Sequence, residues 1–236
     1  ESAFKFAETL AADKNKKITI CLDNFENILD LNNFSQIKNI ISLMNFENKD
    51  VRYIITSSLI SQFKDLKNFE IIEIKNLDKK ESALLIEKII GKTDKKAVDE
   101  IYEFSKGHPL VLKSIASRYK ETKDAKKSFL TELLCKESIT YNYCKNSLSF
   151  YLNLARGQSL LKNILKIIAK KELRLSEIAL ELHRSAPITK AMLERLISVD
   201  LISKKDSRFY FDDKILQHWV KLTQDGYDFD FIPEDK

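Results

Sequence analysis

The stretch Lys17-Ile-Thr-Ile-Cys-Leu-Asp-Asn-Phe-Glu-Asn-Ile-Leu29 decides the fold class of this 236-residue chain. Five residues with strand-forming side chains, 18–22, run directly into Asp23. A buried strand that ends on an acid places a carboxylate at the carboxyl edge of a sheet, where α/β folds bind ligands. In folds that bind phosphate groups, an acid at this position holds the water shell of Mg²⁺. We therefore expect a parallel α/β sheet, with Asp23 as a candidate catalytic residue and metal ligand.

The phosphate-binding loop that normally precedes such an acid does not occur in this sequence. The motif G-x-x-x-x-G-K-[ST] is missing from the residues before Lys17. The tripeptide Gly91-Lys92-Thr93 resembles the end of that motif, but Ile86 stands where its first glycine belongs. The tripeptide also follows a helical pattern, whereas a phosphate loop follows a strand. We predict that Gly91 is the C-cap of a helix.

Composition limits the functional classes. The four glycines and three prolines predict a chain rich in helix and poor in long loops. No run of eighteen apolar residues and no secretory leader pattern occur, so we expect a cytoplasmic protein without a membrane partner. The three cysteines and three histidines lack zinc-site spacing. Residues 155–221 hold fourteen Lys/Arg against eight Asp/Glu, a weak indication of an acidic partner.

The hydrophobic pattern predicts three successive regions. Strands at 18–22, 51–56 and 69–74, with helices at 2–13 and around 34–44, predict parallel pairing through crossovers. After residue 77 the pattern is helical, beginning with a capping box from Asp78 to Glu81. A winged helix is predicted next, with Ser176 as the cap of its second helix and Trp219 in its core. The helices predicted after residue 77 cover 81–90, 94–105, 109–119, 123–135, 138–155, 160–169, 176–182, 189–199 and 213–222, with a hairpin of 201–203 and 208–211.

In this order the segments resemble the STAND class of AAA+ P-loop ATPases, above all the archaeal ATPase family, with NB-ARC-type regulators as further relatives. Residues 22–29 resemble the Walker B strand and residues 51–57 the sensor-1 strand. Residues 74–83 resemble the junction between strand and lid, and Gly107-His-Pro-Leu110 resembles the GxP motif. The stretch from Arg208 to Trp219 resembles the end of the family's winged helix.

The resemblance implies an α/β fold, the partial parallel-sheet core of a P-loop NTPase, followed by an all-α lid and a winged-helix domain. The implied boundaries are 1–76 for the core, 77–154 for the lid, 155–223 for the winged helix and 224–236 for an acidic tail. It implies ATP or ADP with Mg²⁺ as cofactors, once a Walker A segment precedes the chain. By analogy Asp23 holds the metal, Ser57 and Ser58 end the sensor strand, and Gly107, His108 and Pro109 lie near the adenine.

Three positions depart from the family pattern. Asn24 stands where relatives often carry a catalytic Glu, and an amide can orient a water but cannot accept its proton, which implies slow hydrolysis. Ser57-Ser58 replaces an arginine that NB-ARC proteins often have. Asp212-Asp213 replaces their His-Asp pair, and an acid there would repel a diphosphate.

Three functions remain open at this point. The first is a regulatory ATP/ADP-dependent switch, with Asp23 and Asn24 at the reacting phosphate. The second is a DNA-binding regulator whose winged helix contacts DNA through Lys190, Arg195, Lys204, Lys205 and Arg208. The third is a nucleotide-independent scaffold that binds a protein partner or another copy of the chain. For Gly107-His108-Pro109 the structural alternative is a helix break with Pro109 in the first turn.

Overall fold

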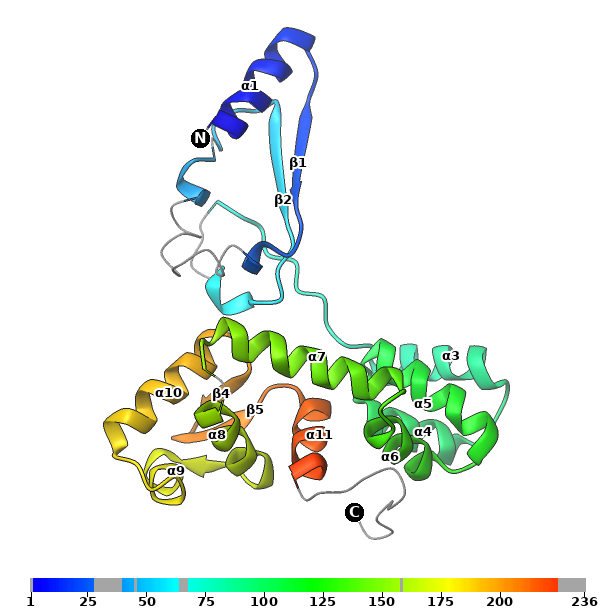
Figure 1. Cartoon of the computed structure of the whole chain (residues 1–236). Coiled ribbons are helices and arrows are strands. Elements are labelled where there is room, and N and C mark those ends of the chain that lie inside the picture. Colours follow the sequence, from blue (N-terminus) through cyan, green and yellow to red (C-terminus); the bar gives the residue numbers. More distant parts are fainter. Residues whose placement is uncertain (1, 28–39, 45, 64–67, 158, 225–236) are drawn as a thin grey trace. The chain divides into compact units, whose positions relative to one another are not determined.

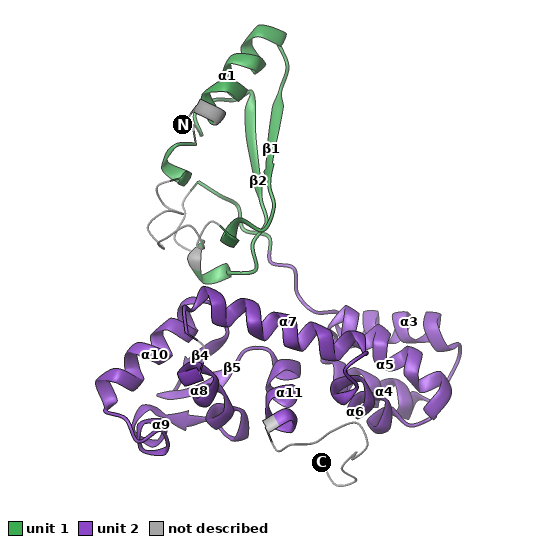
Figure 2. Ribbon diagram, viewed as in Figure 1, with its two compact units in different colours: residues 1–72 green, residues 73–236 purple. Residues whose placement is uncertain are grey.

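The computed structural model describes residues 2–27, 40–44, 46–63, 68–157 and 159–224. It divides the chain into two compact units, residues 1–72 and 73–236 (Figure 2). The fold is mixed α/β and mostly helical, with a small parallel sheet in the first unit and a small antiparallel sheet in the second (Figure 1). The helix predicted around residues 34–44 falls largely outside the described residues.

The first unit is built on a parallel strand pair. β1 (Ile18–Leu22) pairs in register with β2 (Val51–Ile55), as predicted, and α1 (Ser2–Lys14) precedes them. α1 packs on this pair through the edge-to-face contact of Phe4 with Tyr53, whose ring centroids are 5.9 Å apart. A short 3₁₀ helix, η2 (Ile60–Gln62), follows β2. The parallel pairing brings the carboxyl ends of both strands to one edge, where Asp23 follows β1.

The prediction of a third strand at residues 69–74 is wrong. Residues 69–78 have no regular secondary structure, and Ile72 and Ile74 are 82% and 95% exposed. Among the described residues the parallel sheet consists of β1 and β2, and this segment pairs with neither strand. An apolar, β-branched segment forms a strand only when another strand accepts and donates its ladder of hydrogen bonds.

The second unit begins with five helices whose ends follow local sequence signals. Asp78 accepts a hydrogen bond from the Glu81 N–H at 2.8 Å and donates its own N–H to the Glu81 carboxylate at 3.0 Å, which confirms the predicted capping box. Gly91 ends the first of these helices with φ +78°, as predicted. The five helices are α3 (Lys79–Ile90), α4 (Lys95–Ser105), α5 (Pro109–Thr122), α6 (Ala125–Leu134) and α7 (Ile139–Leu154).

The remainder of the second unit, residues 159–224, was predicted as a winged helix and contains four helices and three short strands. Its antiparallel sheet has the order β3-β5-β4, and the two-residue strand β3 was not predicted. The second helix begins at Leu175, so Ser176 is not its cap; the N–H of Arg174 instead donates to the Glu177 carboxylate at 2.7 Å. The elements are α8 (Ser159–Lys170), β3 (Leu173–Arg174), α9 (Leu175–Glu181), α10 (Ala186–Ser198), β4 (Ile202–Lys205), β5 (Arg208–Phe211) and α11 (Lys214–Gln224).

The five-helix region and the predicted winged helix pack together within the second unit. Trp219 of α11 is buried and meets Tyr141 of α7 edge to face, with ring centroids 5.6 Å apart. The Tyr143 hydroxyl donates to Asp213 Oδ2 at 3.0 Å. These contacts join the two regions into one compact unit, and the finer boundary at residue 154 stays a prediction. None of the helices in the described ranges combines the length and hydropathy needed to cross a bilayer.

Candidate functional site

Asp23 lies at the carboxyl end of β1, beside the residue that ends β2. Its Oδ1 accepts a short hydrogen bond from the hydroxyl of Thr56. The same hydroxyl oxygen accepts the backbone N–H of Asn24 at 3.0 Å. The Asp23 side chain is exposed. The parallel strand pair therefore presents a fixed, accessible carboxylate, as the Walker B interpretation requires.

Asn24 turns the chain away from β1. Its φ is +49°, in the left-handed region, which asparagine tolerates better than most residues. The next N–H, from Phe25, donates to the carbonyl of Thr56 at 2.9 Å. The asparagine that was predicted to orient a water thus also has a conformational role in this turn.

Glu26 is a buried carboxylate that the sequence pattern did not single out as a site residue. It is 2% exposed, and its Oε1 accepts the N–H and the hydroxyl of Ser58 at 3.2 and 2.5 Å. Its Oε2 is buried and has no hydrogen-bond partner among the residues that the structure describes. The available signal was an acid three residues after Asp23, which the 3₁₀ turn after β1 brings next to the end of β2.

Of the two serines predicted to face a phosphate, Ser57 has more freedom to do so. Ser58 uses both its N–H and its O–H on Glu26. The Ser57 oxygen accepts the N–H of Leu59 at 3.1 Å, which leaves its O–H able to donate. Asp23, Asn24, Ser57 and Ser58 are thus brought to one edge of the strand pair.

The acidic groups of this edge fit only a metal ion that is held jointly with another ligand. Within the described ranges, no group of three or more His, Cys, Asp or Glu side chains could hold a metal ion by itself. Mg²⁺ usually keeps several waters and binds through one or two carboxylates together with substrate phosphates. Asp23, exposed at the strand end, fits that supporting role.

Gly107, His108 and Pro109 lie in the second unit, where the chain turns between α4 and α5. Gly107 has φ +73°, and a Cβ there would lie 2.0 Å from the carbonyl oxygen of Leu77. Its own carbonyl accepts the Leu77 N–H at 3.0 Å. His108 is the N-cap of α5, with Nδ1 accepting the Val111 N–H at 3.5 Å, and Pro109 opens the helix. The motif therefore forms the predicted helix break with Pro109 in the first turn of α5. The contact of this motif with adenine stays a prediction.

A pocket of about 320 Å³ lies where the five-helix region meets the predicted winged helix. His108 lines it and contacts the Tyr143 ring, with centroids 4.8 Å apart. Asp213, the second residue of the Asp212-Asp213 pair, accepts a hydrogen bond from Tyr143 and also caps α11 through the N–H groups of Ile215 and Leu216 at 2.8 and 3.1 Å. The other lining residues are Asn76, Lys106, Tyr151, Asp200, Leu201, Asp212 and Lys214.

Burial shifts the pKa of two side chains that line this pocket. It lowers the pKa of His108, and the nearby Asp213 carboxylate only partly opposes that effect. Burial also raises the pKa of the Tyr143 hydroxyl, to which the charge of Asp213 and their hydrogen bond add. At neutral pH the pocket therefore holds a neutral imidazole and a neutral phenol beside the aspartate.

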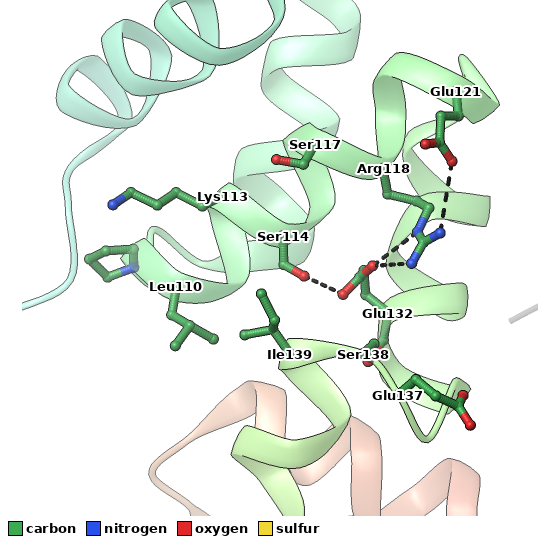
Figure 3. Close-up of a pocket in the computed structure, with 11 residues that line it drawn as sticks. Leu110, Lys113, Ser114, Ser117, Arg118, Glu121, Glu132, Glu137, Ser138 and Ile139 are labelled. Atoms are coloured by element: carbon green, nitrogen blue, oxygen red, sulfur yellow. Dashed lines mark hydrogen bonds and ion pairs between the residues drawn. The ribbon is translucent and has the colours of Figure 1, made fainter.

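A larger pocket, of about 690 Å³, lies along α5 (Figure 3). At its base the buried Glu132 carboxylate accepts a hydrogen bond from Arg118 Nε at 3.0 Å, forms an ion pair with the same guanidinium at 2.9 Å and accepts a short hydrogen bond from the Ser114 hydroxyl. Arg118 also reaches Glu121 at 3.8 Å. Because these side chains pair with one another, we interpret them as contacts that hold α5 against α6 and not as a ligand site.

The structure divides the five cations that were predicted to contact DNA between α10 and the hairpin of β4 and β5. The Arg195 guanidinium donates to the carbonyls of Ala155, at 2.7 Å, and Arg156, which ties α10 to the end of α7. Lys190 pairs with Glu194 at 3.7 Å. Lys204 lies over the Phe209 ring, 5.6 Å from its centroid. Lys205 and Arg208 face each other across β4 and β5.

Comparison with known proteins supports the fold. No family model and no curated protein sequence matches the chain. Among solved structures, the chain is similar to the Walker-type ATPase PABY2304 of Pyrococcus abyssi, with a TM-score of 0.67 and 17% sequence identity. The match covers 92% of this chain and 67% of that one. The chain therefore shares its fold with an archaeal Walker-type ATPase.

Proposed function

We propose that this chain is part of a regulatory, ATP/ADP-dependent switch of the STAND/archaeal ATPase type. The observation that carries the proposal is the Asp23 carboxylate, fixed by Thr56 at the carboxyl end of a parallel strand pair, in a fold shared with a Walker-type ATPase. Asp23 would hold the water shell of Mg²⁺, and Ser57 would donate to a phosphate oxygen. The pocket around His108 and Asp213 is where nucleotide could bias the packing of the five-helix region against the winged helix.

Calorimetric titration of Mg·ATP and Mg·ADP tests this proposal. The titration compares this chain with a longer protein in which a phosphate loop precedes it. Because the sequence has no phosphate loop, we expect weak or no binding by the chain itself. In the longer protein, Asp23→Ala should abolish Mg²⁺-dependent affinity. Asp50→Ala, at the opposite end of the strand pair, is the matched control and should bind normally.

Three results would contradict the proposal. Low-micromolar binding by the 236-residue chain alone would mean that its site does not depend on a phosphate loop. Normal Mg²⁺-dependent binding by Asp23→Ala would remove that residue from the site. Failure of every form to bind nucleotide would favour the scaffold function, in which the first unit only packs against a partner.

Hydrolysis gives a second, independent test of the same site. Because Asn24 cannot accept a proton, we expect slow turnover that a carboxylate at this position accelerates, by about 10²–10⁴-fold for a well-placed general base. Asn24→Asp keeps a residue that tolerates φ +49°, whereas Asn24→Glu adds the longer side chain at a backbone strain of about 1 kcal/mol. An unchanged rate in both variants, with Glu26→Gln inactive, would assign the base to Glu26.

A further inference from the structure

The antiparallel sheet of the winged helix carries a row of three cations. The strand register places Arg174 of β3 opposite Arg208 of β5, and Arg208 opposite Lys205 of β4. Directly opposed residues of antiparallel strands project from the same face, with Cβ atoms about 5 Å apart. Arg174, Lys205 and Arg208 therefore form one line across all three strands, which we call the cationic row.

The cationic row lies on the outer face of this sheet. In the next row, Leu173 and Phe209 are opposed and are 2% and 4% exposed, so that row faces the core. Side chains alternate between the two faces along a strand. The cationic row therefore projects away from the core, and accordingly Arg174 and Lys205 are exposed and Arg208 is half-buried.

The charge of the row is not neutralised by ion pairs. In the described part of the chain, none of its members pairs with a carboxylate within 4.0 Å, and the Arg208 guanidinium donates to the backbone carbonyl of Glu172 at 3.0 Å. The Glu177 carboxylate accepts a hydrogen bond from the backbone N–H of Arg174. Like charges directly opposed across strands destabilise a sheet. An external anion on this face would relieve that repulsion.

The rest of the outer face indicates what kind of anion fits. Tyr210 and Ser203 form the next outward row, and the Lys214 ammonium lies 5.5 Å from the centroid of the Tyr210 ring. The face therefore offers no open apolar anchor, whereas the cores of protein interfaces are rich in apolar anchors and poor in charge. Interfaces with DNA are strongly positive. Single-stranded nucleic acid needs open aromatic rings for stacking, and here a cation already covers the ring.

We propose that the cationic row is a contact surface for the phosphate backbone of a nucleic-acid duplex, bound without readout of the bases. Adjacent strands are about 4.8 Å apart, so the row spans about 10 Å. A DNA duplex presents one charge per about 1.7 Å of axis, enough to engage all three cations. Two of the three are arginines, whose planar fork suits phosphate. The proposal does not depend on nucleotide binding, and it places the contact on the sheet and not on α10.

Fluorescence anisotropy with a labelled DNA duplex of about 20 base pairs, titrated between about 50 and 200 mM salt, tests the proposal on the 236-residue chain. The test variant is the triple Arg174→Ala, Lys205→Ala, Arg208→Ala. The control is the triple Lys162→Ala, Lys166→Ala, Arg184→Ala, which removes the same charge from exposed positions elsewhere in this region. Each lost phosphate contact flattens the slope of log K against log salt by about 0.9, so the test triple should lose about 2 to 3 from the slope. The control should keep most of its slope.

Further measurements distinguish a loss of charge from a loss of folding, and binding of a duplex from binding of other polyanions. The double variant Arg174→Lys, Arg208→Lys keeps the charge and should retain most of the salt slope. Circular dichroism and Trp219 fluorescence should match between the two triple variants. Equal losses in both triples, or no duplex binding at about 50 mM salt, would overturn the proposal. So would tighter binding of a single strand of the same length, or of a polyglutamate peptide of equal charge.

Discussion

Thr56 is hydrogen-bonded to both Asp23 and Asn24 through one hydroxyl group, which donates to the Asp23 carboxylate and accepts the Asn24 N–H. This hydroxyl joins the ends of β1 and β2, because Thr56 also donates its backbone N–H to the Leu22 carbonyl at 3.0 Å. The orientation of the candidate metal-binding carboxylate is thus set by a residue of the neighbouring strand.

Thr56→Val should loosen this edge. It removes both hydroxyl hydrogen bonds, each contributing about 1 kcal/mol, while the side-chain shape is kept. We expect amide hydrogen exchange in β1 and β2 to be at least about fivefold faster, the factor that corresponds to about 1 kcal/mol. Thr56→Ser retains the hydroxyl and is the control. Exchange rates that are the same in the valine and serine variants would show that the hydroxyl does not stabilise this edge.

Glu132 and Glu121 both contact Arg118, but with different expected contributions to stability. Glu132 is 5% exposed in its side chain and Glu121 is 77% exposed. Glu132→Gln should lower the free energy of unfolding of the second unit by about 2 kcal/mol, because the half-buried Arg118 guanidinium loses the charge of its buried partner. Glu121→Gln should cost less than about 0.5 kcal/mol, as for exposed pairs. Urea unfolding followed by Trp219 fluorescence measures both, and similar losses would contradict this assignment.

Gly107 and Gly91 both have positive φ, but only Gly107 lies against backbone. A Cβ at Gly107 would lie 2.0 Å from the Leu77 carbonyl oxygen, whereas a Cβ at Gly91 would have nothing within 4 Å. Gly91→Ala should therefore cost only backbone strain, on the order of 1–3 kcal/mol, because φ +78° with ψ −175° is a conformation that essentially only glycine adopts. Gly107→Ala should cost at least about 3 kcal/mol, because the Leu77 segment must also move. Thermal unfolding compares them, and equal shifts in Tm would show that this segment yields freely.

His108 should make the second unit less stable in acid. Its folded pKa lies below the unfolded value of about 6.5, so the unfolded chain takes up the proton more readily. The contribution is fully present above about pH 6.5 and is lost as the pH falls through the lower, folded pKa. His108→Asn removes the titrating ring and keeps a good helix cap, so it should flatten the pH dependence of unfolding between about pH 7.5 and 5. His183→Asn, at an exposed position, is the control and should leave the pH dependence as it is.

The sequence by itself determined the elements whose signals are local. The strand before Asp23, the capping box of Asp78 and Glu81 and the glycine end of α3 all lie where the pattern predicts them. Each is decided by neighbouring residues: the alternation of a short strand, two reciprocal hydrogen bonds within one turn, and a backbone conformation suited to glycine. The order of these elements was sufficient to predict the mixed α/β class and the likeness to a Walker-type ATPase.

The tertiary structure decided what depends on residues far apart in the chain. The segment 69–74 has the composition of a strand but pairs with no described strand. The Arg195 guanidinium donates to a backbone carbonyl at the end of α7. The burial of Glu26 by Ser58, and the alignment of Arg174 with Arg208 and Lys205, follow from strand ends and registers that no local pattern encodes. Helix caps and turns satisfy their hydrogen bonds within a few residues, whereas strands and aligned charges need partners that only the folded chain brings together.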